Sequence, residues 1–388
     1  MNKIEKLIAE LCPEGVEWKE LREVAYIGTG SSNGNEATEN GKYPLFVRSK
    51  IVKRIDTYEF DEEAIVIPGE GGIGDIFHYI NGKYALHQRA YRIHLLSDEI
   101  STKFVCYYMM SNFKKFILQK AVNATVSSIR KPMIEKFPIP FPPLPIQQEI
   151  VTILDKFTSL EAELEAELEA RTRQYDFYRN QLLSFDNSNV EWRTLGEVGE
   201  FIRGKRFVKD DITSEGVPCI HYGELYTHYK IWTREAKSYL EPTLASRLRV
   251  AKPGDVIIVT AGETIEDIGN AVAWLGESDV VIHDACFAFS HNMNPKYVSY
   301  FLRTNLFRSQ IKKHISSGKI SSVHSSGLSK AKIPVPSLTE QERIVTILDK
   351  FDRLVNDISE GLPAEIKARR KQYEYYREKL LTFNNVNN

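Results

Sequence analysis

Two runs of the chain carry far more lysine and arginine than acid. Residues 103–136 hold seven Lys and Arg side chains against one acid, Glu135, and residues 303–332 hold seven and no acid. Aromatic and small polar residues stand between the cations, as in NFKKFILQKAVNATVSSIRK and FRSQIKKHISSGKISSVH. Lys, Ser and Thr can hold backbone phosphates while Arg, His and Asn reach base edges. The chemistry that these runs indicate is DNA binding, although the net charge of the whole chain is only −1.

The side chains of these runs are the first candidate DNA contacts. In the first run they are Lys114, Lys115, Lys120, Thr125, Ser127, Arg130 and Lys131. In the second run they are Lys312, Lys313, Lys319, Ser321 and His324. The segment IRGKRFVKDD adds Arg203, Lys205 and Arg206. For any one position a solvated surface charge is the competing interpretation, so the prediction depends on the recurrence of the runs.

No motif of the chain predicts catalysis. Residues 69–74 satisfy G-x-G-x-x-G, but a β-type run, DIFHYINGKYAL, follows them where a dinucleotide site needs a helix. Asn81-Gly82 within that run predicts a hairpin turn, and a glycine-rich turn beside a ligand-binding surface is favoured over a cofactor site. P-loop, HExxH and adenine methyltransferase motifs are absent from the sequence. We therefore expect a non-catalytic chain with no cofactor of its own.

Metal, membrane and secretion signals are equally lacking in the sequence. Four cysteines and nine histidines are scattered without metal-ligand spacing, which predicts no metal site and a reducing, cytoplasmic setting. No apolar run reaches the roughly 18 residues of a membrane helix. The N-terminal segment MNKIEKLIAELCPEG mixes Lys and Glu with its apolar residues, so it is not expected to be a signal peptide.

The sequence is duplicated. The octapeptide IVTILDKF occupies residues 150–157 and again residues 344–351. Two further pairs of segments are similar in the two copies: KFVCYYMMSN with KYVSYFLRTN, and RTRQYDFYRNQLLSF with RRKQYEYYREKLLTF. The two basic runs take equivalent places in the copies. This pattern predicts an α+β protein with two mixed α/β recognition domains in tandem, at residues 1–143 and 186–335, and two spacer helices, at residues 144–185 and 336–388.

Each expected spacer helix has apolar residues every 3.5 to 3.6 positions, the pattern of a coiled-coil seam. Because the helices are copies, we predict an antiparallel pair with a pseudo-twofold axis; two independent core helices are the alternative. Pro363 should kink or restart the second helix. The first contains a tandem tetrapeptide, EAEL-EAEL, at residues 161–168.

Two DNA-binding domains on a helical spacer would recognise two half-sites at a fixed separation. The domains have diverged in the middle, IVIPGEGGIGDI against VIIVTAGETIED, which predicts a bipartite, asymmetric target. A free-standing transcriptional regulator with two DNA-binding domains fits the same features. A scaffold that uses only its helices is a third interpretation, and a nuclease or methyltransferase acting alone is the least favoured.

The paired segments PLPIQQEIVTILDKF and PSLTEQERIVTILDKF, with QYDFYRNQLLSF and QYEYYREKLL, resemble the specificity (S) subunits of type I restriction–modification enzymes over nearly the whole chain. HYGELYTHY resembles a stretch of some target-recognition domains, which adds His221, Tyr222 and Tyr226 to the DNA-binding candidates. The resemblance implies a non-catalytic subunit that binds double-stranded DNA and recruits two modification subunits, which methylate adenine with S-adenosylmethionine. Restriction subunits, with ATP and Mg, would add translocation and cleavage. In some members a tetrapeptide repeat in the first helix changes the spacer length, and EAEL-EAEL lies at that place.

Overall fold

The computed structural model describes residues 3–120, 128–185, 189–262, 264–316, 318 and 320–386. The chain divides into two compact units. The first unit comprises Met1–Glu165 and Glu365–Asn388, and the second comprises Ala166–Ala364. Each unit therefore joins the sheets of one sequence copy to a helical segment of the other copy. The domain boundaries expected from the sequence remain a prediction, since the compact units are divided within the long helices.

The first unit is built on a six-stranded sheet with the strand order β2-β7-β5-β6-β3-β4. Neighbouring strands are antiparallel except for β3 and β6, which run parallel. The strands of the unit are β1 (Glu17–Glu20), β2 (Ala25–Thr29), β3 (Tyr43–Phe46), β4 (Lys53–Ile55), β5 (Phe60–Pro68), β6 (His78–Leu86), β7 (Ala90–Leu95) and β8 (Pro138–Phe141). Strands β1 and β8 form a separate two-stranded sheet.

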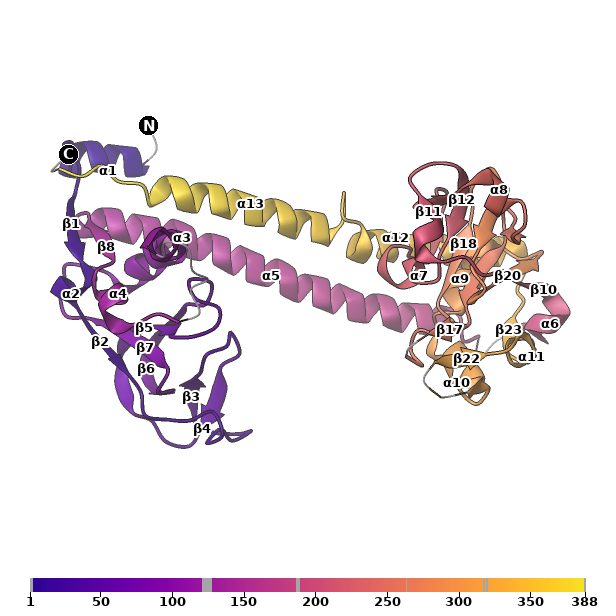
Figure 1. The fold of residues 1–388 in the computed structure, drawn as a ribbon, viewed down its shortest axis with the longest axis horizontal. Helices are drawn as coiled ribbons and strands as arrows, with labels where there is room; N and C mark the ends of the chain where they lie inside the picture. Colours follow the sequence, from indigo (N-terminus) through magenta and orange to yellow (C-terminus); the bar gives the residue numbers. More distant parts are fainter. Residues whose placement is uncertain are drawn as a thin grey trace. The chain divides into compact units, whose positions relative to one another are not determined.

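The second half of strand β5, residues 64–68, is buried on both faces of this sheet. Because side chains alternate along a strand, Ile65 and Ile67 face the core that contains Phe104 and Phe113 of α3, while Val66 joins a second cluster. The helices of the unit are α1 (Lys3–Leu11), α2 (Leu21–Val24), α3 (Thr102–Lys120), α4 (Lys131–Glu135), the first part of α5 (Leu144–Leu182) and most of α13 (Leu362–Leu380) (Figure 1).

The hairpin predicted at Asn81-Gly82 is wrong. Strand β6 continues through both residues, which pair with Glu63 and Glu62 of β5. Gly82 takes a φ of 119° with open space where a side chain would lie, so the strand accommodates it without turning. The turn between β5 and β6 is made instead by the glycine-rich segment, where Gly71, Gly72 and Gly74 all have positive φ. Glycine adopts such angles at little steric cost.

The second unit divides the equivalent strands between two five-stranded sheets, in the orders β10-β20-β16-β18-β13 and β11-β14-β12-β19-β15. Smaller sheets are β17-β22-β21 and β23-β9. The strands are β9 (Trp192–Thr194), β10 (Gly199–Arg203), β11 (Ile212–Thr213), β12 (Val217–Ile220), β13 (Trp232–Thr233), β14 (Ser238–Leu240), β15 (Val250–Ala251), β16 (Val256–Val259), β17 (Ala261–Gly262), β18 (Ala271–Trp274), β19 (Val280–Ile282), β20 (Cys286–His291), β21 (Ile315–Ser316), β22 (Ser321–Val323) and β23 (Lys332–Pro334).

Short helices connect these strands, and α9 packs on β18 and β16 as α3 packs on β5. The helices of the second unit are α6 (Leu195–Val198), α7 (Glu224–Thr227), α8 (Pro242–Ala245), α9 (Pro295–Phe301), α10 (Asn305–Lys312), α11 (Ser325–Leu328), α12 (Leu338–Asn356) and the last part of α5, with a 3-10 turn at Lys209–Asp211. Across the described residues, the helices lack the combination of length and apolar character needed to cross a membrane.

An antiparallel helix pair is present within each unit, as predicted. In the first unit the ring of Phe157 in α5 stacks on Tyr376 in α13, with centroids 5.6 Å apart, and α13 lies alongside α5 (Figure 1). In the second unit Phe351 in α12 stacks on Tyr178 in α5, at 5.4 Å. The two contacts join equivalent residues of the two copies in exchanged roles. The restart predicted at Pro363 is confirmed, because α12 ends at Asn356 and α13 begins at Leu362.

The duplicated helices are tied to the sheet domains by the same polar group in both units. Asp155 of α5 accepts hydrogen bonds from Lys103 Nζ and Tyr107 Oη, each at 2.7 Å. Asp349 of α12 accepts the equivalent bonds from Lys296 and Tyr300, again at 2.7 Å. These charge-assisted bonds fix the orientation of each helix against the helix beneath it.

A histidine whose Nε2 atom is buried makes the second unit sensitive to acid. Burial lowers the pKa of His291 from 6.5 to about 4, and its Nε2 has no described partner. The unfolded chain therefore binds a proton that the folded chain excludes, so stability is lost as pH falls from 6.5 toward 4.

We expect the free energy of unfolding to fall by about 2 kcal/mol between pH 7.5 and pH 5 on account of His291. In His291→Asn the amide oxygen can accept the Met293 N–H that Nδ1 now accepts at 3.1 Å, and no titrating ring remains. Urea unfolding at both pH values measures the difference, which should shrink in the variant. An equal difference in both proteins would contradict this account.

Candidate nucleic-acid interface

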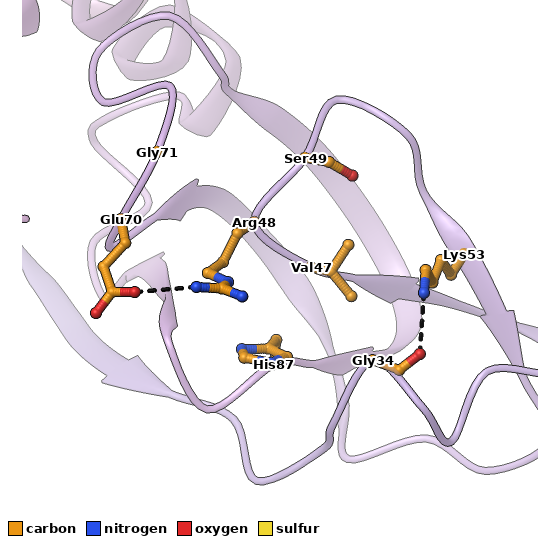
Figure 2. Close-up of a pocket in the computed structure, with 8 residues that line it drawn as sticks. All are labelled: Gly34, Val47, Arg48, Ser49, Lys53, Glu70, Gly71 and His87. Carbon is orange, nitrogen blue, oxygen red and sulfur yellow. Dashed lines mark hydrogen bonds and ion pairs between the residues drawn. The ribbon is translucent and has the colours of Figure 1, made fainter. Parts of the chain in front are cut away.

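The parallel strands β3 and β6 of the first unit end side by side and open a cavity of about 370 Å³. Residues that follow each strand line it, together with the glycine-rich segment after β5. The lining residues are Gly34, Val47, Arg48, Ser49, Lys53, Glu70, Gly71 and His87. Figure 2 shows the Arg48 side chain reaching toward Glu70, with His87 beside it. Chain segments that are 40 residues apart thus meet at one edge of the sheet.

The charges of this first cavity are mostly positive. Glu70 Oε2 accepts hydrogen bonds from Arg48 Nη1 at 3.0 Å and from Arg89 Nη1 at 3.2 Å. Partial desolvation would raise the pKa of Glu70, but the two guanidinium groups outweigh it and lower that pKa. Lys53 Nζ donates to Gly34 O at 3.0 Å on the other side (Figure 2). Three cations against one carboxylate leave a surface suited to a polyanion.

His87 adds a neutral hydrogen-bonding group. Its Nδ1 accepts the N–H of Arg89 at 3.0 Å. Burial, with the positive charges of Arg48 and Arg89, lowers the pKa of His87 below 6.5, so the ring is neutral at pH 7. A neutral imidazole that accepts at Nδ1 carries its proton on Nε2. His87 therefore provides a hydrogen-bond donor to the cavity without a charge.

The second unit has a larger cavity, of about 910 Å³, at the corresponding place. Strands β12 and β19 also run parallel, and their ends lead into the lining. The lining residues are Arg203, Arg206, Phe207, Val208, Lys209, His221, Tyr222, Ala261, Gly262, His283, Asp284, Ala285 and Ile320. The rings of His221 and His283 lie 4.6 Å apart, and Tyr222 lies 5.0 Å from His283. Burial lowers the pKa of both histidines, so two neutral rings can stay in contact.

Backbone register shows that the two cavities are copies of one structure. Phe46 pairs with Leu86 in the first unit and Ile220 with Ile282 in the second. The residue that follows β6 is His87, and the residue that follows β19 is His283. Each histidine accepts a hydrogen bond at Nδ1 from the backbone N–H two residues later. The distance is 3.0 Å for His87 and 3.1 Å for His283.

The loop opposite these histidines is also repeated. Ile129 N–H donates to Gly69 O at 2.9 Å, and Val323 N–H donates to Thr260 O at 2.9 Å. Glu70 is bridged to Ser128 as Ala261 is paired with Ser322. Arg48 corresponds to Tyr222 by the register of β3 and β12, and Glu70 corresponds to Ala261. The frame is shared, and the side chains it presents differ.

Behind each cavity, one glycine allows two backbone segments to approach each other closely. A Cβ on Gly30 would lie 1.8 Å from Leu86 O, and one on Gly204 would lie 2.1 Å from His283 O. No flexible side chain is involved in either approach, so a larger residue would displace the strand end that carries the histidine. Both glycines are required by space rather than by φ.

Four of the predicted DNA-binding residues line the second cavity: Arg203, Arg206, His221 and Tyr222. Tyr226 lies behind Tyr222, at 6.2 Å between ring centroids, and Ser321 is buried opposite Gly262 in β22. The others of this unit are exposed but do not line the cavity: Lys205, whose Nζ donates to Arg247 O at 2.8 Å, Lys312 and Lys313 at the end of α10, and His324 before α11.

The described candidates of the first unit are not among the residues that line its cavity. Lys114 pairs with Asp75 at 2.7 Å and Lys115 with Glu378 at 3.7 Å. Exposed Arg130 precedes α4, and Lys131 pairs with Glu135 at 3.7 Å. Outside the described residues lie Thr125, Ser127, Lys319 and the side chain of Lys120.

Sequence analysis missed the residues that line the first cavity and the histidine of the second. The missed residues are Arg48, Lys53, Glu70 and His87, with Arg89 bonded to Glu70, and His283. A signal existed, because YALH and VVIH end in His87 and His283, 196 positions apart, close to the 194 of the octapeptide. Counting cations over runs could not find a site assembled from single residues.

The described residues include no group of three or more His, Cys, Asp and Glu side chains able to hold a metal ion. All four cysteines are buried and unpaired. The arrangement offers hydrogen bonding, stacking and cationic surface, which are the means of nucleic-acid recognition.

Comparison with known proteins agrees with the duplicated architecture. The family described as type I restriction modification DNA specificity domain matches the sequence twice, over residues 13–170 and 187–368. A protein of Haemophilus influenzae named as a type I restriction enzyme specificity subunit is 30% identical over 95% of this chain and 96% of its own length. A type I restriction enzyme specificity subunit of Escherichia coli is 38% identical over 64% of this chain and 63% of its own length.

Solved structures share the fold. The S subunit of a type I restriction-modification system from M. genitalium matches with a TM-score of 0.57 at 18% identity, over 95% of this chain and 96% of that one. A chain from a study of complex assembly and conformational transition of the type I R-M system matches with a TM-score of 0.64 at 15% identity, over 96% and 98%. The predicted α+β class with two domains and long helices is confirmed.

Proposed function

We propose, because this chain belongs to the family of type I restriction modification DNA specificity domains, that it reads a divided DNA sequence, one half through each of its two cavities. The observation that carries the proposal is the pair of equivalent cavities with different linings. A shared frame with different side chains would recognise two different half-sites. The target would therefore be bipartite and asymmetric.

The chain is a specificity subunit, the non-catalytic DNA-recognition component of a type I enzyme. Cations of both cavities would neutralise phosphates, so affinity should fall steeply with salt. Arginine, histidine and tyrosine side chains of the linings would contact base edges. The exposed lysines of α10, Lys312 and Lys313, would extend the backbone contacts of the second half.

Two modification subunits would bind this chain, because the duplicated helices present the same type of surface twice. Matched internal Asp–Lys–Tyr contacts, at Asp155 and at Asp349, hold each copy in the same orientation against its own unit. The modification subunits would methylate adenine with S-adenosylmethionine. Restriction subunits with ATP and Mg would add translocation and cleavage. All of this chemistry is assigned to the partner subunits.

Deleting one tetrapeptide, residues 165–168, tests bipartite reading. Four residues are about 6 Å of helix, against roughly 3.4 Å per base pair, so the gap between the half-sites should shorten by one or two base pairs. Glu169 would take the place of Glu165, one of the two glutamates paired with Arg370. Sequencing of methylated adenines in cells that carry the chain and its modification partner gives both half-sites and the gap. Unchanged spacing would refute a helical spacer.

The same preparation separates the competing functions. A specificity subunit should co-purify with two modification subunits, whereas a free-standing regulator should not. A scaffold would keep its DNA affinity when Lys312, Lys313 and Lys319 are neutralised together, whereas a DNA reader should lose affinity and part of its salt dependence.

A further inference from the structure

The first cavity contains a carboxylate held between two arginines. Both guanidinium groups bond to the same oxygen, Glu70 Oε2, from Arg48 at 3.0 Å and from Arg89 at 3.2 Å. Among the described residues, Glu70 Oε1 has no hydrogen-bond partner. Arg48 is about half exposed, with 47% of its side chain accessible, and it uses one N–H in this contact. An open acceptor thus lies beside an open guanidinium fork.

A carboxylate is out of place on a surface that only binds phosphate. It repels the backbone, and it weakens the two cations nearest to it. In the major groove, however, the amino groups of cytosine and adenine donate hydrogen bonds that a carboxylate can accept. The fork of Arg48 needs two acceptors on one base, which guanine offers through O6 and N7. A guanine paired with cytosine places these acceptors next to the cytosine N4 donor.

We infer that Arg48 and Glu70 read one G·C base pair in the half-site of the first repeat. Arg48 donates to guanine O6 and N7, Glu70 Oε1 accepts from cytosine N4, and Arg89 holds Glu70 in position. The inference rests on the proposed function of the cavity and adds the identity of a base pair to it.

The second cavity has neither group at the equivalent positions. Tyr222 stands where Arg48 stands, and Ala261 stands where Glu70 stands. A phenol and a methyl group cannot supply the fork and the carboxylate. The Arg48–Glu70 device is therefore confined to the first cavity, which gives the asymmetry a chemical basis.

Two variants of the full complex with its modification subunits test the inference. Arg48→Lys keeps the charge but loses the fork, and Glu70→Gln keeps the shape but gives one oxygen and one amino group. Each should lower the preference for G·C at the same single position by about 10- to 100-fold. The salt dependence of binding should stay unchanged in Arg48→Lys, because the cation remains. Asp61→Asn, an equal change of charge at an exposed site on β5, is the control and should leave the motif intact.

Methylated adenines mapped by sequencing, together with competition between oligonucleotides that differ at each pair, give the result. Tyr222→Ala marks the other half, whose preferences it should alter. Full retention of the G·C preference in Arg48→Lys would show a phosphate contact and overturn the inference. The inference would also be overturned if the two variants lost base preference at different positions. A first half-site without any G·C pair would overturn it as well. If the unmodified complex gives no divided motif, the proposed function fails before this inference is reached. Thermal unfolding of each variant confirms that it folds, and either variant alone decides the outcome if the other does not.

Discussion

A polypeptide that ends at residue 185 should form a homodimer and bind an inverted repeat of the first half-site. It contains the sheets of the first unit but lacks Glu365–Asn388, which complete that unit. A second copy of the polypeptide can supply the missing segment, because its own residues 171–185 match residues 369–383. Both copies would then be completed in the same way, as a twofold dimer requires.

The contacts of the two units support this exchange. In the first unit Phe157 stacks on Tyr376, and in the second unit Tyr178, the equivalent of Tyr376, stacks on Phe351. Leu381 is buried in the first core, as its counterpart Leu183 is in the second. The same side chains are therefore already accommodated by both sheets. The ion pairs of Arg370 with Glu161 and Glu165 would be lost. So would the pairs of Glu378 with Lys115 and of Lys379 with Glu5, because the second copy places Asn180 and Gln181 there.

Sedimentation of the 1–185 polypeptide at micromolar concentration measures the assembly. Phe157→Ala should weaken each of the two equivalent contacts by about 1–2 kcal/mol, so the dissociation constant should rise roughly 30- to 1,000-fold. Phe177→Ala, at an exposed ring on the same helix, serves as the control. A monomer with folded sheets would show that the second copy cannot replace the C-terminal helix.

Gly204→Ala should destabilise the second unit and abolish recognition of its half-site. The new methyl group would lie 2.1 Å from His283 O and 2.4 Å from Ile282 O. Both are backbone atoms of the strand end that forms the cavity, so the strand must move. We expect a loss of about 3 kcal/mol, seen as a fall in melting temperature of roughly 6–12 °C.

Gly223→Ala is the matched control. Gly223 lies in the same unit with helical angles, φ −64° and ψ −23°, and the nearest atom to an added Cβ is His221 Nδ1 at 3.5 Å. The melting temperature of the Gly223→Ala variant should change little. Equal stability of Gly204→Ala and Gly223→Ala would mean that the close approach at Gly204 relaxes without cost.

The helices were predictable from the sequence because they are determined locally. An octapeptide repeated whole, and an aromatic pair repeated near each C-terminal end, identify Phe157, Phe351, Tyr178 and Tyr376 before any coordinates are known. Helical periodicity then states which face must be covered. Because the sequence is duplicated, an antiparallel copy of the same helix was the simplest partner for this apolar face. Both units contain such a helix pair.

The cavities could not be predicted in the same way. Arg48 and His87 are 39 positions apart, and they meet only because β3 and β6 pair in parallel. Which strands become parallel neighbours depends on the packing of the whole sheet, and local sequence carries little of that information. The second cavity was partly found because HYGELYTHY and IRGKRFVKDD hold several of its residues in two short segments.

The Asn81-Gly82 prediction failed for a related reason. The dipeptide favours a tight turn when nothing else constrains it, but here seven residues of β6, from His78 to Tyr84, pair with β5, and the next two, Ala85 and Leu86, pair with β3. Tertiary pairing outweighed a local preference, and the chain turned at Gly71 and Gly72 instead.

The division of the chain into Met1–Glu165 with Glu365–Asn388, and Ala166–Ala364 between them, has a consequence for biosynthesis. Residues up to 165 leave the ribosome before the second unit, yet the first unit is completed only after residues 365–388 have been made. The second unit is continuous and can close while the last helix is still being made. A premature stop codon near residue 365 would release a protein in which the unit synthesised first is the one left open.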